Sequence, residues 1–151
     1  MNVCFEFRMS TTKNLRWLSQ VSLFLFLMML GTFASAQVKD FKVKNSTNTA
    51  ERTIMIDLLR NKMKTEFSME FKYVVNHFKV SGNFAWFKGD AQRKDGKEIV
   101  LDEEGAYDCC HVECLFKKVN NKWTILEYGA FSTDVWYEGI GERLGAPATI
   151  F

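Results

Sequence analysis

The stretch YDCCHVECLF, residues 107–116, gathers three cysteines, one histidine and two carboxylates. Residues of these types could hold a metal ion, could form a thiol nucleophile with its base, or could simply belong to a strand. The choice depends on the element that carries them, because the element decides which side chains share a face.

Strand alternation argues against a metal site. Successive side chains of a strand point to opposite faces, so Cys110 and Cys114 would lie on one face and Cys109 and His111 on the other. Structural zinc needs four ligands that converge on one point. We therefore predict no metal and no cofactor.

A thiol-based active site is disfavoured by distance. Cys109, His111 and Glu113 share one face in the order thiol, imidazole, carboxylate, which is the order that a nucleophile, its base and an orienting acid would need. Residues two apart on a strand are about 6.5 to 7 Å apart, whereas a base must come within about 3.2 Å of the thiol. We assign no catalytic residue.

As a strand, the stretch divides into two rows of side chains. Free cysteine behaves as a small buried hydrophobe, so we expect one row to face the core: Asp108, Cys110, Val112, Cys114 and Phe116. The more polar row should face water, a cleft or a partner: Cys109, His111, Glu113 and Lys117.

The N-terminal segment has the three parts of a secretory signal peptide. Lys13 and Arg16 precede the apolar run WLSQVSLFLFLMMLGTF, residues 17–33, and Ala34 and Ala36 form a small-x-small cleavage site. A retained membrane anchor is the alternative, because the run approaches the roughly 18 residues of a spanning helix. We predict a signal peptide over residues 1–36, an exported protein that is periplasmic or extracellular, and no membrane attachment after cleavage.

The chain after residue 36 has roughly 115 residues, enough for one domain with a real core. Its basic and acidic residues are equal in number, so the small positive charge of the whole chain belongs to the leader. Nucleic-acid binding would need a basic patch, and we predict none.

Export would place three cysteines in an oxidising compartment, where thiols usually pair. An odd number cannot pair completely within the chain. An exposed Cys109 could therefore link two copies as a homodimer, and a bond to its neighbour Cys110 is an alternative, although a strained one.

The remaining sequence predicts an α+β domain over residues 49–151, after a flexible leader over residues 37–48. An amphipathic helix is expected over 49–67, where apolar residues recur at four-residue spacing. Four strands follow, with a bulge near Asn76 and His77, a turn at residues 81–83, a strand over 107–119, an Asn120–Asn121 turn and a strand over 123–131. A short C-terminal helix should begin near Ser132 or Thr133. This order predicts a cystatin-like roll, with the helix packed on a curved four-stranded antiparallel sheet.

Five segments together resemble an uncharacterised family of small exported bacterial proteins. They are MIDLLR (55–60), FKVSGNFAWFKGDAQRKDG (78–96), LFKKVNNKWTI (115–125), STDVWYEG (132–139) and GAP (145–147). The resemblance implies a compact α+β domain and a location in the cell envelope. It brings no known reaction or catalytic residue, and the CCHVEC cluster is not part of the family pattern.

We expect a non-enzymatic binding or structural domain that takes a small apolar ligand or an envelope protein through its curved sheet. The alternative is a small hydrolase or isomerase that uses Asp57, Asp108 or Glu113 as a pocket acid. Arg93 and Asp95 could form salt bridges with Asp57 or Arg60 of the helix. The candidate binding residues are Asp57, Arg60, Arg93, Cys109, His111, Glu113 and Asp134.

Overall fold

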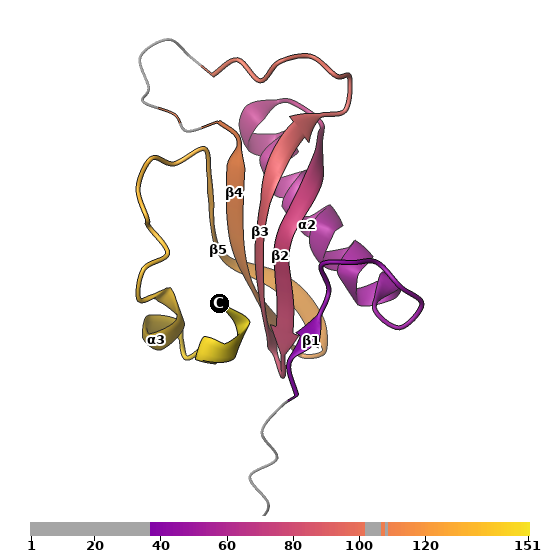
Figure 1. The fold of residues 1–151 in the computed structure, drawn as a ribbon, viewed down its shortest axis with the longest axis vertical. Coiled ribbons are helices and arrows are strands. Elements are labelled where there is room, and N and C mark those ends of the chain that lie inside the picture. The colour runs from indigo at the N-terminus through magenta and orange to yellow at the C-terminus, as the bar shows by residue number, and fades with distance from the viewer. Residues whose placement is uncertain (1–36, 102–106, 108) are drawn as a thin grey trace, which may run out of the picture. The chain divides into compact units, whose positions relative to one another are not determined.

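The computed structural model describes residues 37–101, 107 and 109–151. The signal peptide predicted for residues 1–36 and the carboxylate of Asp108 lie outside this part of the chain. The described residues form an α+β fold with one N-terminal helix, a five-stranded antiparallel open sheet and a short C-terminal helix (Figure 1).

Helix α2 spans Thr49–Phe67, as its hydrophobic period predicts. Met55, Ile56, Leu59 and Met63 are its buried residues, and they form the stripe that faces the sheet. Asn48 occupies the N-cap without a side-chain hydrogen bond to the helix. Its Oδ1 accepts from the backbone N–H of Asn45 at 2.9 Å instead.

The strands follow one another through the sheet in chain order. They are β1 (Lys39–Asp40), β2 (Phe71–Ser81), β3 (Phe84–Arg93), β4 (His111–Val119) and β5 (Lys122–Ala130). The predicted bulge is confirmed, because the register between β2 and β3 shifts between Val75 and His77. The β4–β5 hairpin turns at Asn120 and Asn121, whose φ angles are 48° and 61°. Asparagine tolerates this left-handed backbone better than most residues.

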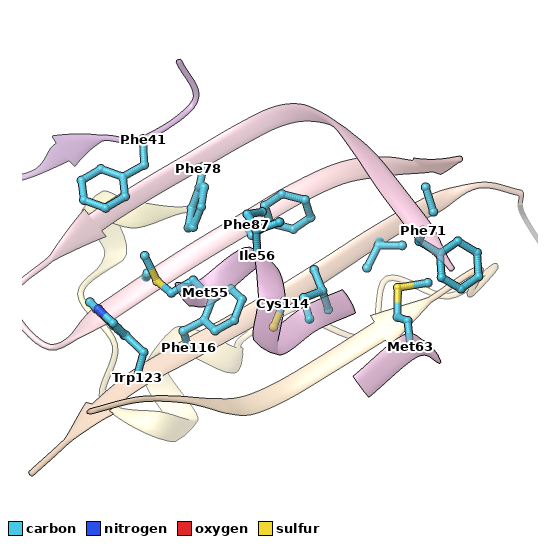
Figure 2. Packing of buried hydrophobic residues seen from close by; sticks show 14 of the residues in the cluster. Phe41, Met55, Ile56, Met63, Phe71, Phe78, Phe87, Cys114, Phe116 and Trp123 are labelled. Carbon is cyan, nitrogen blue, oxygen red and sulfur yellow. The ribbon is translucent and has the colours of Figure 1, made fainter. Parts of the chain in front are cut away.

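Two apolar layers cover the two faces of the sheet. The larger core lies between the sheet and α2 and is rich in phenylalanine (Figure 2). A smaller cluster lies on the opposite face, where Trp86 and Leu115 are covered by Ile140, Ala146 and Ile150 of the C-terminal segment. We call the first the helix face and the second the outer face.

Residues 37–48 differ from the flexible leader that the sequence predicts. β1 pairs with β2 and adds a fifth strand, with Lys39 opposite Val80. Phe41 is buried in the helix-face core, and its N–H donates to Phe78 O at 2.7 Å. Arg52 of α2 donates from Nε to Phe41 O at 2.8 Å. A buried aromatic ring thus ties a polar segment to the sheet.

Strand β4 begins later than predicted, at His111 rather than near Tyr107. Cys109 and Cys110 form a turn just before the strand and are joined by a disulfide. Val112, Cys114 and Phe116 face the core as expected, whereas Cys110 is half-buried outside the strand.

The C-terminal helix also begins later than predicted. It is α3, Ile140–Leu144, and a 3-10 turn, η1, follows at Ala148–Ile150. Ser132 caps no helix, because the chain passes through turns over residues 133–139. Gly139 has a φ of 67°, which places a left-handed residue just ahead of the helix. Pro147 lies three residues after the last residue of the helix, where its lack of a backbone N–H breaks no helical hydrogen bond.

Candidate functional site

The strand register places four residues in one row across the outer face. His77 of β2 lies opposite Lys88 of β3, Lys88 opposite Glu113 of β4, and Glu113 opposite Gly129 of β5. Directly opposed residues of antiparallel strands present their side chains to the same face at close range. The row therefore sets a carboxylate beside a lysine in the middle of the sheet.

A second row lies beside the first. Val74 of β2 is opposite Asp90 of β3, and Asp90 is opposite His111 of β4. Asn76 Nδ2 donates to Asp90 Oδ2 at 2.7 Å, which holds that carboxylate in place. Together with Tyr137 from the C-terminal segment, the two rows form what we call the outer-face polar cluster: Lys88, Asp90, His111, Glu113 and Tyr137.

Glu113 is the most unusual member of the cluster, because its side chain is only 4% exposed. Lys88 Nζ lies 3.9 Å from Glu113 Oε1, and His111 Nε2 lies 4.0 Å from Oε2. Both distances are near the upper limit for an ion pair. Burial raises the pKa of Glu113 above its ordinary value, since removal from water disfavours the charged form. The charges on His111 and Lys88 and the indole of Trp136 oppose that rise in the pKa without cancelling it.

One oxygen of this buried carboxylate makes no hydrogen bond of ordinary geometry within the described chain. Glu113 Oε2 and the indole Nε1 of Trp136 are both buried without such a bond, although the indole acts on the carboxylate closely enough to lower its pKa. Trp136 stands directly over the sheet at Gly129, where an added Cβ would come within 2.2 Å of its Nε1. The lack of a side chain at residue 129 thus lets the indole lie close to the carboxylate.

Tyr137 completes the side of the cluster formed by the C-terminal segment. Lys88 Nζ donates to Tyr137 Oη at 3.0 Å and lies 4.4 Å from the centre of its ring. Trp86, buried beneath, contacts both Trp136 and Tyr137, with ring centres 6.2 and 5.5 Å away. His77 Nε2 is 2.6 Å from Ile150 O, which fastens the end of the segment to β2.

This arrangement has two chemical capacities. Glu113 Oε2 can accept a hydrogen bond from a cation, a hydroxyl or an N–H group that displaces the indole of Trp136, because the oxygen itself has almost no exposed surface. A carboxylate with a raised pKa beside an imidazole can also exchange a proton. Among the described residues, no group of three or more His, Cys, Asp or Glu side chains could hold a metal ion.

Asp57 and Arg60 lie elsewhere, on the exposed side of α2. Arg60 Nη1 donates to Asp57 Oδ1 at 2.7 Å, so the two residues pair within the helix. They line a pocket of about 300 Å³ together with Asn61, Lys64, Glu70, Phe71 and Lys94. Lys64 and Lys94 bind Glu70 at 2.6 and 3.3 Å, and these contacts lower the pKa of Glu70.

The salt bridges that the sequence suggested between Arg93 or Asp95 and the helix residues Asp57 and Arg60 are not formed, because Arg93 pairs with Asp95 itself. Arg93 Nε donates to Asp95 Oδ1 at 2.9 Å, two residues along the chain, and this bond lowers the pKa of Asp95. Asp134 is exposed in the turns after β5, where its N–H donates to Ser132 Oγ at 3.1 Å. Neither belongs to the outer-face polar cluster.

Of the seven predicted site residues, the structure brings His111 and Glu113 together on the outer face. Cys109 does not join their row, because it lies in the turn and is bonded to Cys110. Glu113 was expected in the polar row that faces water, a cleft or a partner, yet it is buried. The cap formed by Trp136 and its neighbours accounts for that burial.

Sequence reasoning missed Lys88, Asp90, Trp136 and Tyr137 as parts of the site. Lys88 and Asp90 alternate with apolar residues in FAWFKGDAQ, a pattern that places them on one face. The alternation does not tell which residue of β4 each one opposes. Trp136 and Tyr137 reach the cluster through the path of the C-terminal segment, for which no sequence signal exists.

Within the described chain, no helix is long and apolar enough to cross a membrane. No protein-family model, curated protein or solved structure matches the sequence.

Proposed function

We propose that the domain binds a protein partner through its outer face, and that the partner donates a hydrogen bond to Glu113. The observation that carries this proposal is Glu113 Oε2, which makes no hydrogen bond of ordinary geometry and belongs to a side chain that is only 4% exposed. An unpaired buried acceptor costs roughly 1 to 3 kcal/mol, so a partner that supplies a donor recovers that free energy. An arginine or lysine side chain of the partner would suit the carboxylate.

The helix face offers less support for the small apolar ligand that the sequence also suggested. Its concave side is filled by the core side chains of α2 and the sheet, including Phe78, Phe87 and Phe116, which are all fully buried (Figure 2). A ligand there would have to displace packed aromatic rings.

The rim of the cluster has the composition of a recognition surface. Val74, at 47% exposure, lies opposite Asp90, and Val135, at 60%, adjoins the two aromatic residues of the cap. Protein interfaces commonly combine aromatic anchors with a polar surround. The rim therefore favours a partner protein over a free polar molecule.

A photo-activated cross-linking residue at position 74 tests the proposal. Val119 provides the matched control, since it is also 47% exposed but lies at the far end of β4. We expect position 74 to cross-link a partner when the protein is expressed in its own cell envelope, and position 119 not to. Glu113→Gln, which removes the charge, should weaken the cross-link at position 74.

Two outcomes would count against this interface. Equal cross-linking at positions 74 and 119 would mean non-specific collision. Cross-linking at position 74 that Glu113→Gln leaves unchanged would mean that the partner does not use the carboxylate.

A small hydrolase or isomerase is the second candidate, and the raised pKa of Glu113 beside His111 favours it. A general acid works best when its pKa is near the working pH. If this candidate holds, Glu113→Gln and His111→Gln should each abolish turnover on an ester panel, and the pH profile should show the ionisation of Glu113. Of the three acids considered, Asp57 is half-exposed and paired with Arg60, which makes it the weaker candidate.

The setting of this function is part of the proposal. We place the protein outside the cytoplasm, in the periplasm or the extracellular space, after removal of the leader. We further propose a cystatin-like roll for the finer architecture, and Cys109 as a link between two copies where its bond to Cys110 is opened.

A further inference from the structure

The Cys109–Cys110 disulfide lies in a pocket whose lining shares no residue with the outer-face polar cluster. The pocket has a volume of about 400 Å³ and is formed by Lys72 of β2, the end of β3, residues 96–99 and the two cysteines. Cys109 is exposed, whereas Cys110 is half-buried against the helix-face core. A molecule in the pocket can therefore reach the sulfur of Cys109.

The backbone holds the two cysteines unequally. Ala91 N–H donates to Cys110 O at 2.7 Å, which extends the β3–β4 pairing by one residue before the start of β4. Cys109 has no such bond to β3 within the described chain. An attack on the sulfur of Cys109 thus leaves Cys110 fixed in place as the departing thiolate.

The charges around the pocket favour thiolates and carboxylates. Among the described residues that line it, Lys72 and Lys97 are cations without a carboxylate partner of their own, Arg93 is paired with Asp95, and Glu98 is the acid, so a small positive surplus remains. Neighbouring cations stabilise a thiolate relative to its thiol and so lower a cysteine's pKa. They would also attract an incoming thiol that carries carboxylates.

The third cysteine of the domain, Cys114, cannot react with a thiol in the pocket. Cys114 is fully buried in the core on β4, and burial raises the pKa of its thiol well above the ordinary value. It is neither ionised nor accessible at neutral pH, so it serves as an internal control.

We propose that Cys109–Cys110 is a thiol–disulfide exchange site for small thiols that carry carboxylates. The incoming thiolate bonds to the Cys109 sulfur, the Cys109–Cys110 bond breaks, and Cys110 leaves as a thiolate that takes a proton from water. A second thiolate then attacks the sulfur of the bound small thiol and releases Cys109. Two small thiols are oxidised to their disulfide, and the protein disulfide is reduced to two thiols.

The exchange is tested on the purified chain with glutathione, which carries two carboxylates, and with cysteamine, which carries a cation instead. Each rate is divided by the rate of the same thiol with an unstructured peptide disulfide, which removes intrinsic reactivity. We expect this normalised rate to be severalfold higher for glutathione, and the difference to shrink as salt screens the charges.

Variants locate the effect. Lys97→Gln should lower the normalised glutathione rate, and Lys79→Gln, on the outer face, should leave it unchanged. These two variants have no disulfide, so they are treated with glutathione disulfide, and the remaining cysteine thiolate attacks it and releases one glutathione thiolate. Cys110→Ser should accumulate a mixed disulfide at Cys109, detected by mass spectrometry, because no neighbouring thiol can expel the adduct. Cys109→Ser should form its adduct at the half-buried Cys110 more slowly.

Three results would overturn the proposal. Both cysteines could be alkylated in the untreated protein, which would show that no disulfide exists. The normalised rates of the two thiols could be equal, which would show that the charges of the pocket do not select the thiol. Glutathione could also reduce the disulfide only after the chain has been unfolded, which would show that the folded pocket does not admit it. Measurement of the folded fraction of each variant by circular dichroism separates these results from loss of structure.

Discussion

At the scale of single residues, Glu113 is buried without a hydrogen bond of ordinary geometry at its Oε2 atom. Its ionised form therefore destabilises the fold, and a partner that supplies a donor would stabilise it. Burial removes it from water, and the nitrogens of Lys88 and His111 stand 3.9 and 4.0 Å from its oxygens rather than in hydrogen-bond contact. A carboxylate placed like this costs folding free energy unless it is protonated or bound.

The raised pKa of Glu113 predicts a specific dependence of stability on pH. The folded state holds its proton more tightly than the unfolded state, so the free energy of unfolding falls as pH rises from the ordinary glutamate pKa through the raised value. Glu113→Gln should remove that part of the slope and make the protein relatively more stable at neutral pH. Chemical denaturation at a series of pH values measures this.

Glu98→Gln is the control for that experiment, since it removes the same charge from an exposed side chain. If the wild-type and Glu113→Gln curves run parallel across the acidic range, Glu113 does not titrate differently in the folded state.

At the scale of elements, the sequence predicts the features that a local residue pattern determines, such as the bounds of a helix and the position of a turn. α2 begins and ends where its period predicts, and Asn120 and Asn121 turn the last hairpin as expected. β1 could not be predicted, because two residues carry no period and Phe41 finds its place through a contact with Phe78, whose ring centre is 5.8 Å away. The register that sets Lys88 beside Glu113 is likewise a property of the assembled sheet.

The attachment of β1 predicts the effect of one substitution. Phe41→Ala should destabilise the domain by about 3 kcal/mol or more, because a buried ring is lost and a cavity remains. Val43→Ala, two residues along and 72% exposed, should change stability by less than about 0.5 kcal/mol. Urea denaturation of both variants is the measurement. Equal small effects would mean that residues 37–48 do not contribute to the core.

At the scale of the whole domain, a single sheet separates two cores, and strands β3 and β4 take part in both. Phe87 and Cys114 face α2, whereas Trp86 and Leu115, their chain neighbours, face the C-terminal segment. Loss of packing on one face should therefore destabilise strands β3 and β4 and, through them, the core on the other face. Figure 1 shows α2 and α3 on the two sides of this shared sheet.

Trp86→Ala tests this coupling. The substitution should destabilise the domain by about 3 to 5 kcal/mol, since Trp86 is buried among three aromatic rings of the C-terminal segment. The helical signal of α2, followed by circular dichroism, should melt at the same lowered temperature as the aromatic signal. If α2 keeps its original midpoint, the two cores unfold independently.

The chain-order arrangement of the strands bears on how quickly the domain forms. Each strand pairs with the one next to it in the sequence, so the sheet can grow by hairpins that close short loops. Helix α2 is different, because its polar partners include Lys118 and Trp123, which bond Glu51, and Tyr128, which bonds Glu66. These residues belong to the last hairpin, whereas α2 precedes every strand except β1. The helix can therefore make these contacts only once β4 and β5 have met, so we expect its full docking to be a late step of folding.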